Sequence, residues 1–161
     1  MKEPISVNLG EVVVSSDPAD VLVAYGLGSC LGITMVDRQR HICGLLHAVL
    51  PHRLNGADPY CAKYVDSGIE GLLDAMLKAG ADRRNLIIRM VGGANMLTTA
   101  GLSKTFDVGT RNIESAHETL QRLNLPLHAE ETGGHSGRTV RVYVATGRVT
   151  VRVVGGVEKD L

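Results

Sequence analysis

Short apolar runs, several of them alternating with polar residues, follow one another along most of the chain, a pattern typical of β-strands. The expected strands cover residues 11–14, 21–23, 31–36, 42–50, 86–91, 127–132, 138–145 and 148–154. The last two form the clearest hairpin, because valine alternates with polar residues in both and Thr146-Gly147 supplies the turn. Across this turn the pattern places two sets of valines face to face, Val140, Val142 and Val144 against Val149, Val151 and Val153.

Two segments instead repeat apolar residues at the spacing of a helix. The first covers residues 60–78, and Gly80 is positioned to end it. The second begins near Thr110, with Thr110 and Asp107 as alternative capping residues. Residues 98–109, between the last of the central strands and this helix, are expected to form a loop.

These strands and the two helices predict an α+β fold with packed mixed β-sheets, a β-sandwich-like core flanked by helices on its outer faces. A length of 161 residues suits one domain, so residues 1–161 are expected to form a single unit. Aromatic residues make up only 3% of the chain, so the core must consist of Val, Leu, Ile, Ala and Met. The tail, residues 155–161, is expected to be loose.

Charge and hydropathy exclude several classes of partner. Lys and Arg number 17 and Asp and Glu number 17, so no global field attracts the protein to nucleic acid or to an anionic membrane. The first residues lack the pattern of a signal peptide, and the longest uncharged stretch, 21–36, is short for a membrane span. We therefore expect a cytoplasmic protein without nucleic-acid binding or membrane insertion.

Three cysteines without a Cys-x-x-Cys pair argue against a disulfide framework and against a structural zinc site. Cys30 differs from the other two because the segment 24–32, AYGLGSCLG, places it in a glycine-rich turn between two apolar runs. Gly28-x-Cys30-x-Gly32 has the spacing of a nucleophile elbow, whereas the turn fails the dinucleotide and P-loop templates. The alternative is that Cys30 is a small buried core residue, the usual position of a free cysteine.

A catalytic thiol needs a base that accepts its proton. His47 is the best candidate, because it is the only histidine in the otherwise apolar run 42–50. The alternative is a hydrogen-bonded core histidine. The remaining histidines stand in polar or loop contexts and are expected on the surface: His41, His52, His117, His128 and His135.

Five motifs in order carry a resemblance to a known family. They are Gly26-Leu-Gly28-Ser-Cys30, Gly44-Leu-Leu-His47-Ala-Val-Leu-Pro51, Gly92-Gly-Ala-Asn-Met96, Val108-Gly-Thr-Arg-Asn112 and Ala129-Glu-Glu-Thr-Gly-Gly134, the last followed by Gly137-Arg138. Over nearly its whole length the chain resembles the chemoreceptor glutamine deamidase family, CheD.

The resemblance implies a fold similar to the catalytic domain of the cytotoxic necrotizing factor toxins. It also implies that Cys30 is the nucleophile and His47 the general base of a protein-glutamine glutaminase that acts on methyl-accepting chemotaxis receptors. The backbone at Gly28 and Ser29 is then expected to stabilise the oxyanion, with no cofactor and no metal. A CheC-type phosphatase is the second partner that the resemblance implies.

One position departs from the family. A threonine commonly stands six residues before the cysteine and supports the Cys-His pair, whereas this chain has Ala24, which offers no side-chain hydrogen bond. A backbone carbonyl, Tyr25 or Ser29 would then orient the histidine. Two other functions stay open: a weakly active or inactive module that docks on receptors or on CheC, and a thiol hydrolase of the α/β-hydrolase type, which a parallel sheet would favour.

Overall fold

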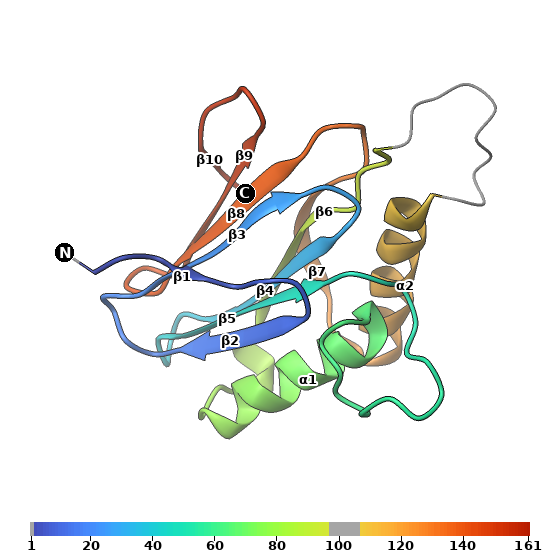
Figure 1. Ribbon diagram of the computed structural model, residues 1–161. Helices are drawn as coiled ribbons and strands as arrows, with labels where there is room; N and C mark the ends of the chain where they lie inside the picture. Colours follow the sequence, from blue (N-terminus) through green and yellow to red (C-terminus); the bar gives the residue numbers. More distant parts are fainter. Residues whose placement is uncertain (1, 97–106) are drawn as a thin grey trace.

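The computed structural model describes residues 2–96 and 107–161, and in it two five-stranded sheets pack face to face (Figure 1). One sheet, called the β3 sheet here, contains β1 (Ile5–Ser6), β3 (Val21–Leu27), β8 (Arg138–Tyr143), β9 (Arg148–Val153) and β10 (Lys159–Asp160) in spatial order. The other, the β4 sheet, contains β2 (Glu11–Ser15), β5 (Ile42–Ala48), β4 (Leu31–Asp37), β6 (Ile87–Gly92) and β7 (Leu127–Thr132).

Both sheets are mixed. β1 runs parallel to β3 and β6 runs parallel to β7, while the other neighbouring pairs are antiparallel. The expected α+β class with packed mixed sheets is therefore confirmed. Similarity to the cytotoxic necrotizing factor domain stays a prediction.

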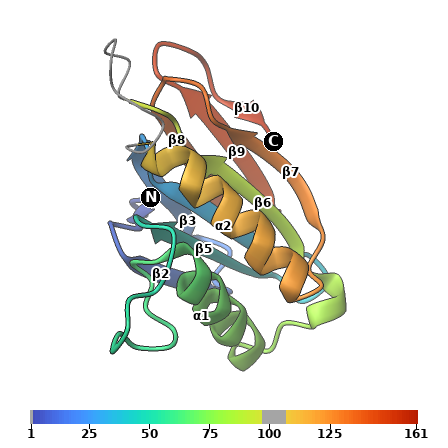
Figure 2. The same ribbon diagram turned by 90° about the vertical axis from the view of Figure 1, so that its right-hand side faces the viewer.

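Two helices, α1 (Val65–Lys78) and α2 (Val108–Arg122), lie side by side against the β4 sheet (Figure 2), and a short 3₁₀ helix spans Arg83–Asn85. The expectation that helices cover the outer faces of both sheets is wrong for the described residues. The outer face of the β3 sheet carries polar side chains such as Arg141 and Arg148, which can face water without a covering helix.

The core has two parts, one between the helices and the β4 sheet and one between the two sheets. Every residue of β4 and β5 is buried, because these central strands are covered on both faces. Leu31 and Ile33 face the helices, whereas Leu45 and Val36 face the β3 sheet. His47 therefore belongs to a strand with little freedom to move, and Cys30 directly precedes such a strand.

Several expected boundaries change. The first helix begins at Val65 rather than residue 60, and Gly80 follows its cap, Ala79, with a φ of +104°. Asp107 is the cap of α2, because its side chain accepts a hydrogen bond from the Thr110 amide at 3.0 Å. Residues 98–106, most of the expected loop, lie outside the described residues.

The expectation of a loose tail is wrong. β10 pairs antiparallel with β9, and the amide of Leu161 donates to the carbonyl of Val149 at 3.0 Å. Tyr143 also donates a hydrogen bond to the Glu158 carboxylate, 2.9 Å to Oε2. No helix in the described part of the chain is long and apolar enough to cross a membrane.

Candidate active site

Cys30 lies where the chain leaves the β3 sheet and enters the β4 sheet. β3 ends at Leu27, three residues form the turn, and β4 begins at Leu31. The pairing of β3 with β8 is irregular between Ala24 and Leu27, and Gly26 has a φ of +62° within this irregular stretch. A strand follows the cysteine, and the sheets are mostly antiparallel, which disfavours the α/β-hydrolase alternative.

The carbonyl oxygens of all three turn residues accept hydrogen bonds from other segments of the chain. Gly28 O accepts from the Ala94 amide at 2.8 Å, and Cys30 O accepts from the Gly93 amide at 2.9 Å. Ser29 O accepts from Nδ2 of Asn112 at 2.8 Å. In a trans peptide the N–H points opposite to the carbonyl, so the amides of Ser29 and Cys30 face the other way.

These two amides are available as donors. Among the described residues, neither donates a hydrogen bond to another residue. The Cys30 amide points toward its own sulfur, where it favours the thiolate. Ser29 and Cys30 therefore offer two adjacent backbone donors beside the candidate thiol, the type of donor from which oxyanion holes are built.

Gly92 supports the turn by close approach. It has a φ of +114°, and a Cβ atom built there would lie 2.2 Å from the carbonyl oxygen of Cys30. Gly92 O in turn accepts from the Gly133 amide at 3.0 Å, which joins this loop to the segment after β7. Gly92 is therefore needed for the backbones to approach behind Cys30, and its carbonyl joins this loop to the segment that contains Gly133.

Arg138 lies in the same assembly. Its NH1 donates to the carbonyl oxygens of Gly133 at 2.7 Å and Gly92 at 3.4 Å. The guanidinium thus holds two loops together.

His47 stands in β5 and is only 4% exposed. Its Nδ1 lies 2.9 Å from the carbonyl oxygen of Val7. Because a carbonyl oxygen only accepts, Nδ1 carries the proton, and in the neutral imidazole Nε2 is then the basic nitrogen. Nε2 has no hydrogen-bond partner among the described residues, so it is free to accept a proton.

The strand register brings Cys30 and His47 to one face of the β4 sheet. His47 lies directly opposite Gly32 on β4, and Cys30 precedes Gly32 by two residues. Cys30 accordingly packs against the core between the sheets, on the side where His47 points. The two side chains are diagonal neighbours across the strands, but no hydrogen bond joins them, and such contacts commonly tighten when substrate binds.

Burial raises the pKa of two of the cysteine thiols. It raises the pKa of Cys30 above the ordinary value of 9.0, although its own amide acts in the opposite direction. Burial raises the pKa of Cys43 to about 11. Cys43 shares the inner face of β5 with His47 but is almost fully covered, which makes it a core residue rather than a second nucleophile.

Ala24 is fully buried in the core between the two sheets, which also contains Val7, and it follows Val23, the residue that pairs with Ser6 of β1. Of the three ways to orient His47 without a threonine, the structure contains the backbone carbonyl. Tyr25 instead points to the outer face, where its ring lies 5.6 Å from the guanidinium carbon of Arg141.

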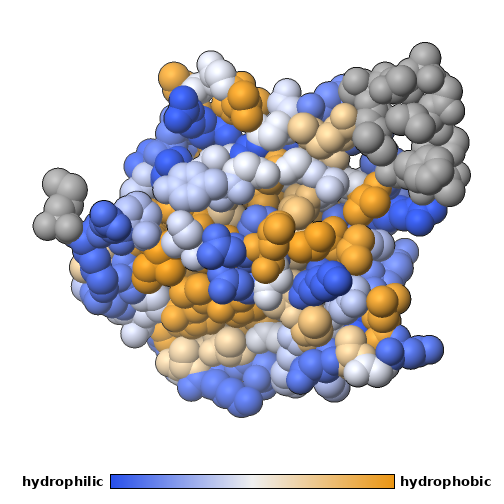
Figure 3. Space-filling model, in the orientation of Figure 1, coloured by the Kyte–Doolittle hydropathy of each residue, from blue (hydrophilic) through white to orange (hydrophobic). Residues whose placement is uncertain are grey.

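Two hollows flank the glycine turn. The larger, of about 430 Å³, is lined by Val7, Asn8, Leu9, Tyr25, Gly26 and His47. The smaller, of about 230 Å³, is lined by Ser29, Ala94, Asn95, Met96, Asp107, Val108 and Gly109. Apolar surface is exposed on the face that carries β1 and β2 (Figure 3), and Leu9 at 65% exposure and Tyr25 at 51% rim the larger hollow. A side chain from another protein therefore has room to approach His47.

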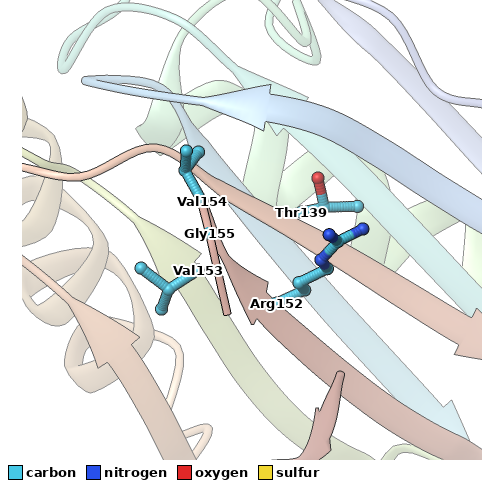
Figure 4. A pocket seen from close by; sticks show the side chains of 5 residues that line it. All are labelled: Thr139, Arg152, Val153, Val154 and Gly155. Atoms are coloured by element: carbon cyan, nitrogen blue, oxygen red, sulfur yellow. The ribbon is translucent and has the colours of Figure 1, made fainter. Parts of the chain in front are cut away.

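A third hollow, of about 220 Å³, lies beside β8 and β9 (Figure 4). It is lined by Thr139, Arg152, Val153, Val154 and Gly155. Its only ionisable group, Arg152, donates from Nε to Gly156 O at 2.9 Å. With no base and no thiol it is not part of the candidate site.

The five other histidines are exposed, as expected: His41, His52, His117, His128 and His135. Within the described residues no three His, Cys, Asp or Glu side chains are arranged to hold a metal ion. The sequence did not identify Val7, because a backbone acceptor leaves no residue-type signal. It marked Asn112 as part of a motif without indicating its contact with Ser29.

Comparison with known proteins places these motifs in one family. The model of the family described as "CheD chemotactic sensory transduction" matches residues 49–153. The probable chemoreceptor glutamine deamidase CheD of Symbiobacterium thermophilum is 42% identical over 158 residues, which is 97% of this chain and 96% of the relative. The proteins of the same name from Thermococcus kodakarensis and Pyrococcus abyssi are 41% and 40% identical, over 93% and 97% of this chain and 92% and 96% of their own lengths. The family match begins after His47, whereas the relatives align over nearly the entire chain.

Proposed function

The chain belongs to the CheD family, and on that premise we propose that it is a cytoplasmic protein-glutamine deamidase of chemoreceptors. It converts side-chain amides of receptor glutamines to carboxylates and releases ammonia. The observation that carries the proposal is the position of Cys30, on a turn whose carbonyls are anchored and whose amides are available, diagonal to a histidine with a free Nε2.

The reaction begins from a protonated thiol, because burial raises the pKa of Cys30. Nε2 of His47 accepts the thiol proton as Sγ attacks the carbon of the glutamine amide and forms a C–S bond. The negative charge moves to the amide oxygen, and the amides of Ser29 and Cys30 stabilise it. The anchored carbonyls of Gly28 and Ser29 keep these donors in place.

The tetrahedral intermediate collapses when the C–N bond breaks and His47 returns its proton to the departing ammonia. Water then attacks the thioester and gives a proton to His47, the C–S bond breaks, and the thiol regains its proton. The net change is one water consumed, one ammonia released and one glutamate formed. Each event adds a negative charge to the receptor, which changes repulsion between neighbouring helices.

Val7 orients the base through its carbonyl in place of the family threonine at position 24. The hydrogen bond to Nδ1 keeps Nε2 basic and stabilises the imidazolium that forms when the proton arrives. A CheC-type phosphatase remains the second partner of the proposal, on the resemblance alone.

The test uses the purified protein and a cytoplasmic receptor fragment, with ammonia release and a gain of one dalton per modified glutamine as readouts. Wild type is compared with Cys30→Ala and His47→Ala, and Cys61→Ala serves as the matched thiol control. We expect both site variants to lose conversion and Cys61→Ala to retain it. Equal conversion by Cys30→Ala would remove Cys30 from the mechanism, and wild-type binding of the fragment without conversion would favour the docking module.

A further inference from the structure

Asn112 connects the two segments that carry the candidate catalytic residues. It lies near the start of α2, and its side chain is fully buried. Nδ2 donates to Ser29 O at 2.8 Å and to Val49 O at 3.0 Å. Ser29 immediately precedes Cys30, and Val49 follows His47 by two residues.

The orientation of this amide follows from its partners. Both neighbours are carbonyl oxygens, which only accept, so the NH₂ group must face them. Its two hydrogens diverge in one plane, and the two carbonyls are therefore fixed in relation to each other. Oδ1 is buried without a partner among the described residues, which costs free energy that an apolar side chain would avoid. An amide at this position is thus better explained by the two donors than by core packing.

A neighbouring residue of α2 makes a comparable contact elsewhere. Ser115 is also buried, and its hydroxyl donates to Pro51 O at 2.6 Å. Pro51 lies beyond the end of β5, and Ser115 makes no hydrogen bond to the glycine turn. Both residues attach α2 to the backbone, but Asn112 alone of the two reaches the segment of Cys30.

We propose that Asn112 is a positioning residue that sets the geometry between Cys30 Sγ and His47 Nε2. By holding Ser29 O it also directs the Cys30 amide toward the reacting atoms, since carbonyl and N–H point in opposite directions in that peptide. The inference rests on the proposed deamidation, but alkylation of Cys30 tests it without a receptor.

The experiment compares wild type, Asn112→Asp, Asn112→Ala and Ser115→Ala, each with and without the additional substitution His47→Ala. Asn112→Asp preserves the shape, but its carboxyl has no hydrogen to donate when ionised and only one when protonated. Iodoacetamide alkylation at pH 7.5 is followed by mass spectrometry of the peptide containing Cys30, which separates it from Cys43 and Cys61. The assistance from His47 is the rate ratio between a protein and its His47→Ala counterpart. Melting temperature, kcat and KM for the receptor fragment are measured in parallel.

In both Asn112 variants we expect the rate ratio that measures His47 assistance to fall to about one. We also expect kcat to fall at least about tenfold while KM changes little, because the reacting groups are displaced but the receptor fragment still binds. Ser115→Ala should lower the melting temperature by a similar amount and retain the assistance. The inference is overturned if folded Asn112→Asp keeps the wild-type ratio, if Ser115→Ala loses it equally, or if wild type itself shows none. A wild type with His47 assistance but no ammonia release would reject the proposed function while leaving the role of Asn112 to be decided by the alkylation ratios.

Discussion

Gly92 faces the carbonyl group of Cys30 so closely that a Cβ atom at Gly92 would lie 2.2 Å from the carbonyl oxygen. Gly92→Ala must therefore displace backbone, and it also places a side chain at a φ of +114°. We expect a loss of about 2–4 kcal/mol in the free energy of unfolding, from strain and overpacking together. Urea unfolding measures this loss. Gly133→Ala is the matched control, because Gly133 has a φ of +79° with open space around it, and an equal loss in both variants would contradict the close-approach argument.

The pH dependence of Cys30 alkylation follows from its burial. A raised pKa means less thiolate at any given pH, so Cys30 in the folded protein should react with iodoacetamide more slowly at pH 7 than in urea. The rate should continue to rise through pH 9. Cys43, with a pKa of about 11 and almost no exposure, should react more slowly still. Peptide-resolved mass spectrometry gives the alkylation rate of each cysteine as a function of pH. A midpoint of the Cys30 rate profile below pH 8 would indicate a resting thiolate–imidazolium pair instead.

Ala24→Thr restores the residue type that the family commonly has at this position. Because Val7 O already binds Nδ1 of His47, we expect turnover to stay within about threefold of wild type, a change of less than 1 kcal/mol in the activation free energy. Ala24 is fully buried between the sheets, so the larger side chain should cost about 1–3 kcal/mol of stability. Ala24→Ser, which adds only a hydroxyl, is the control for volume. A rise in kcat of tenfold or more with threonine would show that the carbonyl is a poor substitute.

The hydrogen bonds of the buried Asp37 carboxylate predict that the protein loses stability in acid. Asp37 is fully buried at the end of β4, where burial raises its pKa but hydrogen bonds from the amides of Asp82 at 2.8 Å and Arg40 at 3.0 Å, among others, lower it below 3.8 overall. A lowered pKa gives stability that is present above the unfolded pKa and is lost as the pH falls through the folded pKa. Wild type should therefore lose stability below about pH 4, near the unfolded value.

Asp37→Asn provides the comparison. It should cost about 1–3 kcal/mol at pH 7, because an amide that accepts through one oxygen cannot satisfy these donors. It should lose less than wild type on acidification from pH 5 to pH 2. Thermal unfolding across this range measures both effects, and parallel losses in the two proteins would assign the acid sensitivity to other carboxylates.

The parts of the fold that depend on neighbours in sequence could be predicted. The β8–β9 hairpin pairs valines as expected, with Val140 opposite Val151 and Val142 opposite Val149, but four residues, 144–147, rather than Thr146-Gly147 alone connect the strands. Its alternation and turn are local signals, whereas the two-residue strands β1 and β10 exist only through pairing with β3 and β9. The sequence pattern therefore did not predict β1, and its prediction of a loose tail was wrong.

The candidate site divides in the same way. Cys30 and His47 were identifiable as candidates because a thiol in a glycine turn and an imidazole in an apolar strand are unusual in themselves. Their register through Gly32 and the anchoring of the turn by Asn112 connect residues 15 to 83 positions apart, and the spacing of residues does not reveal such contacts.

The acceptor for His47 is a main-chain oxygen, and this has a genetic consequence. Each of the twenty residue types carries that oxygen, proline included, so no single replacement of Val7 deletes it. A screen of point mutants for loss of activity should recover Cys30 and His47 and pass over position 7, unless a replacement disturbs the course of β1. Part of this site therefore depends on where the backbone lies, and an alignment of residue types does not reveal it.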